Sequence, residues 1–250
     1  MTAKEVRFRP ARMVFVYLIW NLSWILPTTF TKIDFIMKYI TDFAYSYFED
    51  FIIIGIIGCV FIGRQKFKEF SNWIFTKQNG IILMIHVLFC IAIVAADSYI
   101  GHYSADWIAL MNCAVDAVLF NGFVEEWVFR GYFVNQFSKM VVNERKIVLV
   151  TAVFFSLMHL PNYCLATEVI TFGGIIYRLL IPFLMGIALA IIFLKAKNLF
   201  VCSLIHGVYN LISYITNGWW MYACYGIYWI MIILYIGYCC KIESMKKDYI

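Results

Sequence analysis

Apolar residues run along this chain in long stretches separated by short polar segments. A helix needs about 20 apolar residues to cross the hydrocarbon core of a bilayer. By that measure the chain holds about eight membrane spans, near residues 12–30, 44–63, 80–97, 106–137, 147–161, 174–194, 199–216 and 219–240. The fifth is expected to end at His159-Leu160-Pro161, because a proline disfavours helix in the residue before it. We therefore predict an all-α, polytopic integral membrane protein that forms a single transmembrane domain over residues 1–250, with its catalytic core helices in about 106–216.

Residues 32–43 show a different pattern. Apolar side chains recur there at helical spacing and alternate with lysine and aspartate. A short helix lying in the membrane interface has this amphipathic pattern. We predict an interfacial helix over about residues 32–43.

Basic residues give the orientation. If the N-terminus is cytosolic, the inner segments hold sixteen Lys and Arg, whereas the outer segments hold only Lys32 and Lys38. Cytosolic loops carry the excess of positive charge in membrane proteins. Both termini are therefore predicted to be cytosolic, and the short loops favour a bacterial cell membrane.

Composition agrees with a membrane location and excludes other classes. Hydrophobic residues make up 64% of the chain and charged residues 14%, whereas soluble domains carry roughly 25% charged residues. The net charge of +5 does not indicate nucleic-acid binding, since the basic residues border apolar segments. Seven of the eight cysteines lie in apolar stretches and no CxxC pair is present, so we expect them to pack as small apolar side chains.

The predicted fourth span carries charge where charge is costly. Glu125, Glu126 and Arg130 lie in the stretch FNGFVEEWVFRGYF, and Asp116 precedes them. A charged group at the centre of a bilayer costs at least about 2.5 kcal/mol and usually marks a functional site. Glu126 and Arg130 are spaced to form an ion pair on one helix face, which leaves Glu125 to face a cavity. Asp116 is expected to face elsewhere and to bond to a polar neighbour.

Two histidines lie where they suit the same site. His159 follows Phe155 by four residues near the end of the fifth span, and His206 precedes Asn210 by four residues on one face of the seventh. Gly207 leaves room for a close neighbour at that face. Their depths allow Glu125, His159 and His206 to meet in the inner to middle part of the membrane.

These groups are the ones needed to add water to a carbonyl. A carboxylate can act as the base, and a histidine can help to activate water or protonate the leaving amine. Asn210 and His206 suit the role of hydrogen-bond donors to an oxyanion.

Three motifs carry a family resemblance. EEWVFR fits the pattern EExxxR, FSLMH fits FxxxH and HGVYN fits HxxxN. Together, over about residues 115–216, they resemble the CPBP family of intramembrane proteases (CAAX proteases and bacteriocin-processing enzymes, also called Abi), which includes the type II CAAX prenyl endopeptidase. The resemblance implies that Glu125 activates water together with His159, that His206 and Asn210 form the oxyanion hole, and that Glu126 and Arg130 support the site.

No cofactor is expected, and zinc is the less favoured alternative. The chain has no HExxH motif, and Asn210 suits a hydrogen bond better than a metal bond. His86, between Ile85 and Val87, is interpreted as a hydrogen-bonded packing residue rather than a ligand.

Three functions stay open at this point. The first is an endopeptidase that cuts a peptide bond near the cytosolic side of the membrane, in a protein that is prenylated or carries a leader peptide. The second is a non-catalytic immunity or binding protein that uses the same cavity. The third, a transporter with a proton-relaying carboxylate, is disfavoured because the sequence shows no internal repeat.

Overall fold

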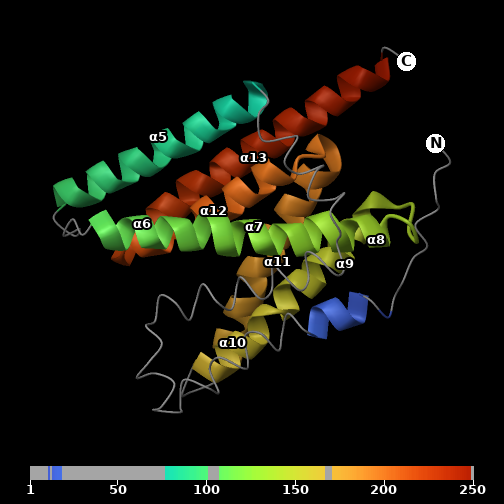
Figure 1. The fold of residues 1–250 in the computed structure, drawn as a ribbon, viewed down its shortest axis with the longest axis horizontal. Helices are drawn as coiled ribbons and strands as arrows, with labels where there is room; N and C mark the ends of the chain where they lie inside the picture. Colours follow the sequence, from blue (N-terminus) through green and yellow to red (C-terminus); the bar gives the residue numbers. More distant parts are fainter. Residues whose placement is uncertain (1–10, 12, 19–76, 101–106, 167–170, 249–250) are drawn as a thin grey trace. The chain divides into compact units, whose positions relative to one another are not determined.

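The computed structural model describes residues 11, 13–18, 77–100, 107–166 and 171–248 (Figure 1). The described residues form helices and no strand, which confirms the all-α prediction. The predicted span near 44–63, the interfacial helix at 32–43 and most of the span near 12–30 lie outside these residues.

The helices follow one another with short connections. Their bounds are α5 (Lys77–Ile100), α6 (Trp107–Val115), η2 (Asp116–Gly122), α7 (Phe123–Glu126), η3 (Trp127–Val134), α8 (Asn135–Phe137), α9 (Glu144–Leu157), α10 (His159–Ala166), α11 (Phe172–Ala196), α12 (Leu199–Ile215) and α13 (Gly218–Asp248). The labels η2 and η3 denote π-helices.

Three of these helices are long and apolar enough to cross a membrane. They cover Lys77–Tyr99, Phe172–Ala196 and Gly218–Ile242, in agreement with the spans predicted near 80–97, 174–194 and 219–240. Among the shorter helices, α12 is apolar over 17 residues and α9 has 14. The expected total of about eight spans is not confirmed by the described part of the chain.

The chain divides into two compact units. The first unit combines Met1–Gly63 with Gly131–Ile187, and the second combines Arg64–Arg130 with Ala188–Ile250. Each unit brings together segments that are far apart in the sequence. The organisation as a single domain stays a prediction.

Asparagine side chains start two of the helices. Asn143 accepts hydrogen bonds from the backbone N–H groups of Arg145 and Lys146 at the start of α9, and Asn198 accepts one from Val201 at the start of α12. Such caps satisfy donors that have no partner inside the helix. The caps fix where each helix begins, and therefore the positions along the helix axis of the residues that follow.

The predicted end of the fifth span at Pro161 is wrong. A turn at Met158 separates α9 from α10, and α10 then continues from His159 to Ala166 with Pro161 in its first turn. The first turn of a helix tolerates proline, because its backbone N–H groups have no partner within the helix.

Within the first unit, α9 and α11 pack closely. A Cβ atom on Gly186 would lie 2.9 Å from Ala152 Cα, so the two backbones are in near contact. Ser156 Oγ donates a 2.6 Å hydrogen bond to the carbonyl of Leu179, three residues before Pro182 within α11. Neighbouring hydroxyls commonly satisfy backbone groups near a proline in an apolar helix.

Within the second unit, α12 packs against η2, α5 and α13. Tyr228 OH donates to the carbonyl of Ile205 at 3.0 Å, which ties α13 to α12. Asn198 Nδ2 donates to Asn79 Oδ1 at 2.5 Å, which ties the start of α12 to α5. These polar contacts fix α12 among apolar surfaces.

Candidate active site

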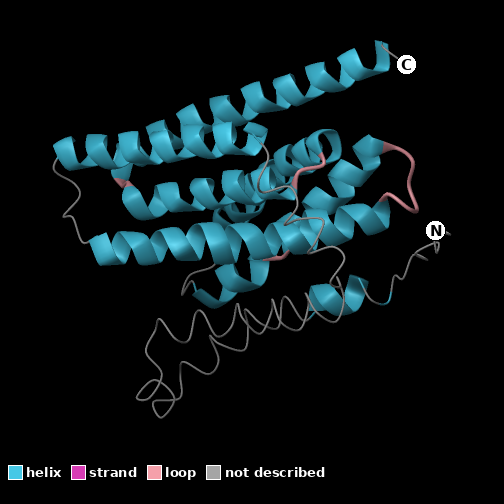
Figure 2. Ribbon diagram, turned by 45° about the horizontal axis from the view of Figure 1, so that its top comes forward, coloured by secondary structure: helices cyan, strands magenta, loops and turns pink. Residues whose placement is uncertain are grey.

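The acidic pair lies in a long helical stretch with an irregular hydrogen-bond pattern. The ribbon stays helical from Trp107 to Phe137 (Figure 2), which confirms a helix over the predicted 106–137. Within it, α7 (Phe123–Glu126) is a single α-helical turn between the π-helices η2 and η3. Such π-helical segments occur frequently at functional sites, because they redirect the side chains that follow.

Two glycines bring α12 against this stretch. A Cβ atom on Gly207 would lie 2.5 Å from Val118 Cα and 2.9 Å from Ala117 O, and one on Gly122 would lie 2.7 Å from Ser203 O. Small residues allow backbones in membrane proteins to approach this closely. The room predicted beside Gly207 is therefore filled by the backbone of η2, and His206 is held beside α7.

Glu126 is the centre of a buried cluster. Arg130 Nη1 donates to Glu126 Oε1 at 2.7 Å, as its spacing predicted, and His206 Nδ1 lies 3.0 Å from the same oxygen. Glu126 has 0% exposure and Arg130 2%. Two donors on one carboxylate oxygen form a charge-assisted network, which is the arrangement that a buried charge requires.

Glu125 lies on the other side of the same imidazole. Its Oε2 is 3.7 Å from His206 Nε2, longer than a hydrogen bond but close enough for strong attraction if the ring is charged. Glu125 and His206 are both buried, at 4% exposure each. The cluster thus holds two carboxylates, one guanidinium and one imidazole shared between the carboxylates. That Glu125 faces a cavity stays a prediction.

Asn210 lies one turn beyond His206 on α12 and is half-buried. No hydrogen bond of its side-chain amide occurs within the described ranges. The i and i+4 spacing puts the amide on the same helix face as the imidazole.

His159 is the first residue of α10 and belongs to the first unit, whereas Glu125 belongs to the second. His159 Nδ1 lies 2.8 Å from the carbonyl of Phe155, and its ring makes an edge contact with the Phe155 ring. A carbonyl oxygen only accepts hydrogen bonds, so Nδ1 carries a proton and Nε2 is the basic nitrogen of the neutral ring. The meeting of His159 with Glu125 stays a prediction.

Asp116 has the polar neighbours expected for it. Its Oδ2 accepts a 3.1 Å hydrogen bond from Asn121 Nδ2 and a 3.4 Å bond from Tyr214 OH. The sequence interpretation missed the pairing with Tyr214, although Tyr214 follows Asn210 by four residues and so lies on the same helix face.

The sequence interpretation also missed the direct contact between Glu126 and His206. It assigned Glu126 to Arg130 alone, since only the spacing within one helix was visible. The signal that could have located the contact is the pair of glycines, Gly122 and Gly207. Gly122 precedes Glu125 by three residues and Glu126 by four, and Gly207 directly follows His206.

The donor set of the cluster suits hydrogen bonding. Glu126 Oε1 accepts from both Arg130 and His206. Over the described residues, no group of three or more His, Cys, Asp or Glu side chains is arranged to hold a metal ion. The seven cysteines in this part of the chain are free thiols.

The segment that contains these residues matches a protein-family model. Residues 107–212 match the family model described as type II CAAX prenyl endopeptidase Rce1-like. All three motifs lie inside the matched segment, so the match confirms the resemblance to CAAX proteases. No curated protein and no solved structure matches the chain. The matched family model is named for an endopeptidase, and the three membrane-length helices agree with an integral membrane protein.

Proposed function

We propose, from the match of residues 107–212 to a family of CAAX prenyl endopeptidases, that this protein is an intramembrane endopeptidase. It hydrolyses a peptide bond near the cytosolic side of the membrane, in a peptide or protein substrate that is prenylated or carries a leader segment. Both termini lie in the cytosol of a bacterial cell. The observation that carries the proposal is the buried cluster of Glu125, Glu126, Arg130 and His206.

Glu125 is the general base in this mechanism. It takes a proton from a water molecule as the water oxygen bonds to the scissile carbonyl carbon, and His159 assists through its basic Nε2. The carbonyl oxygen becomes an oxyanion. When the C–N bond breaks, the proton passes from Glu125 to the leaving amine, so that the base is regenerated. A base of this kind contributes about 100- to 10,000-fold in rate.

His206 and Asn210 stabilise the oxyanion. The Asn210 amide donates through Nδ2–H. The contact to Glu126 decides the charge of His206: its Nδ1 proton is directed at the Glu126 carboxylate, so Nε2 donates only if it carries a second proton. In this mechanism the ring carries both protons when it donates to the oxyanion through Nε2. With Arg130, a ring in that form balances the two carboxylates.

Glu126 and Arg130 are positioning residues. Glu126 holds the imidazole ring with Nε2 turned toward Glu125, and Arg130 keeps a cation beside Glu126. Removing either one leaves a buried charge without compensation. The proposed mechanism uses no metal ion, and the two donors on Glu126 Oε1 agree with a carboxylate that acts through hydrogen bonds.

Comparative proteomics of peptide termini in membrane fractions tests the function. Cells that make the wild-type protein, a Glu125→Gln variant, a Glu144→Gln variant or no protein are compared. Glu144 is exposed in the first turn of α9 and serves as the matched control. We expect a new terminus with wild type and Glu144→Gln that is absent with Glu125→Gln. The same terminus in the Glu125→Gln cells would contradict the mechanism, and a phenotype such as immunity that survives without any new terminus would favour a binding protein.

A further inference from the structure

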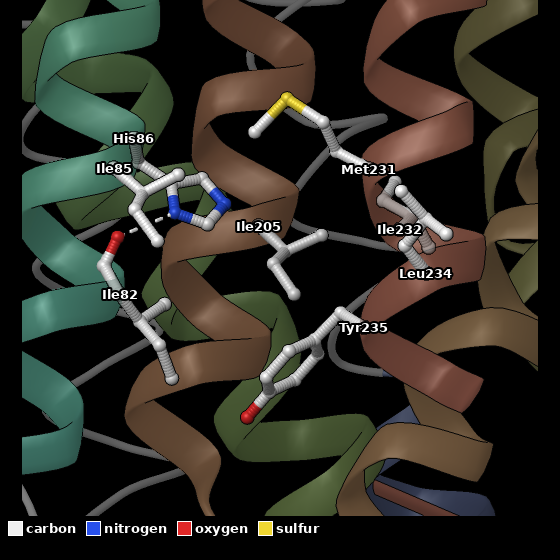
Figure 3. Close-up of a pocket in the computed structure, with 8 residues that line it drawn as sticks. All are labelled: Ile82, Ile85, His86, Ile205, Met231, Ile232, Leu234 and Tyr235. Atoms are coloured by element: carbon white, nitrogen blue, oxygen red, sulfur yellow. Dashed lines mark hydrogen bonds between the residues drawn. The ribbon is translucent and has the colours of Figure 1, made fainter. Parts of the chain in front are cut away.

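A cavity lies among α5, α12 and α13, and none of the residues that line it belongs to the acidic cluster. It has a volume of about 280 Å³, and its wall is apolar apart from His86 and Tyr235. Figure 3 shows His86 on α5 facing Ile205 of α12, with the side chains of α13 opposite. The cavity lies between helices of the second unit.

The bond to Ile82 fixes what His86 offers to this cavity. His86 Nδ1 lies 2.8 Å from the carbonyl of Ile82, so this nitrogen carries the proton. A charged imidazole in an apolar wall is costly, and the ring is therefore neutral. Nε2 is then a hydrogen-bond acceptor, and Figure 3 shows it turned away from Ile82 toward Ile205. No hydrogen bond to Nε2 occurs in the part of the chain that the structure describes.

Water is a poor occupant of such a space. A buried water needs two to four polar partners, and an apolar cavity of about 150 Å³ stays dry and takes up benzene instead. This cavity is larger, and it lies just below the range of about 300–1,000 Å³ typical of sites for drug-sized ligands. Its shape and volume suit one small apolar molecule or one lipid chain.

Two of the residues that line the cavity, one on α5 and one on α13, are also exposed on the outer surface of these helices. Ile85 of α5 and Leu234 of α13 are exposed, at 45% and 68%. Both helices are long and apolar enough to cross a membrane. With these helices spanning the membrane, as the proposed function requires, a molecule that enters past these side chains comes from the bilayer.

From the apolar wall, the acceptor of fixed tautomer and the opening toward lipid, we propose that this cavity binds a lipid alcohol from the membrane. The alkyl part lies against the isoleucines, and the hydroxyl donates to His86 Nε2. The hydroxyl is the smallest group that satisfies this acceptor while the rest of the molecule stays apolar.

Photolabelling with two matched probes tests the proposal. The first probe is decanol with a diazirine in its chain and a terminal alkyne, and the second is its methyl ether, which lacks the donor. Both are added to membranes that contain the full chain. We expect the alcohol to label peptides of α5 and α13 about fivefold more than the ether, the ratio that one neutral hydrogen bond gives.

Variants separate the cavity from the outer surface. His86→Phe keeps an aromatic ring but removes the acceptor, and Ile85→Trp blocks the rim from an exposed position. Leu88→Trp is the matched control, since Leu88 is 57% exposed on α5 and does not line the cavity. We expect labelling to persist in Leu88→Trp and to fall to the level of the ether in the other two. Equal labelling by both probes, no labelling by either, or labelling that Ile85→Trp does not reduce would overturn the proposal.

Discussion

Replacing Gly207 by alanine perturbs the contact that brings α12 to the acidic pair. The new Cβ atom would lie 2.5 Å from Val118 Cα and 2.9 Å from Ala117 O, whereas ordinary contacts begin at 3.4 Å. Backbone atoms cannot rotate aside as a side chain can. The two helices must therefore separate by about 1 Å, which is also the scale of displacement that costs about 100-fold in catalysis.

The expected loss of stability follows from two opposing terms. Overpacking costs about 1–3 kcal/mol, and alanine returns about 0.5–1 kcal/mol because it favours helix over glycine. We expect a net loss of about 1–2 kcal/mol, seen as a fall of about 2–8 °C in the melting temperature. The melting temperature is measured in detergent by intrinsic fluorescence, and the cleavage rate is measured on the same preparation.

Gly226→Ala provides the control for Gly207→Ala. Gly226 lies within α13, and a Cβ atom there would meet nothing within 4 Å. The same chemical change should leave the melting temperature equal or slightly raised and the cleavage rate unchanged. If Gly207→Ala were as stable and as active as Gly226→Ala, the close approach of α12 and η2 would not be what positions His206.

Three further predictions concern the cluster and its chemistry. Arg130→Met should lower the free energy of unfolding by about 3–5 kcal/mol in a denaturation assay, because Glu126 keeps a buried charge. The double variant Glu126→Leu with Arg130→Met should recover most of that loss in the same assay. Equal stability of the single and double variants would contradict the energetic coupling of Glu126 with Arg130. Asn210→Leu should lower kcat by about 100- to 1,000-fold with an unchanged melting temperature, as loss of an oxyanion donor does; a change confined to KM would assign Asn210 to binding instead. Dialysis against a strong chelator should leave the cleavage rate within about twofold of the untreated enzyme; a loss that zinc restores would contradict the metal-free mechanism.

The local part of the site was predictable from sequence. The pairing of Glu126 with Arg130 follows from helical spacing alone, and the structure confirms it at 2.7 Å. The hydrogen-bonded role of His86 was likewise expected, because a lone histidine among apolar residues finds a backbone carbonyl nearby. Such contacts form within a few residues, so the period of the helix determines them.

The rest depends on contacts between helices. His206 meets Glu126 across 80 residues because two glycines allow close packing, and hydrophobic periodicity does not identify the partner of a helix. The π-helical segments around α7 were not predicted, since one extra residue per turn leaves little trace in a uniformly apolar stretch. Pro161 was predicted to end a helix, whereas it lies in the first turn of α10. A proline ends a helix in the interior but is tolerated in the first turn, and the sequence did not show that a new helix begins at His159. The cavity at His86 arises from side chains of three helices, and no single segment indicates it.

The cleavage rate of purified Glu125→Gln tests the central claim most directly. Wild type, Glu125→Gln and Glu144→Gln are compared in detergent on the peptide that the terminus proteomics identifies. At a temperature where all three proteins are folded, we expect Glu125→Gln to be about 100- to 10,000-fold slower than wild type and Glu144→Gln to match wild type. A Glu125→Gln enzyme within tenfold of the wild-type rate would show that this carboxylate is not the base.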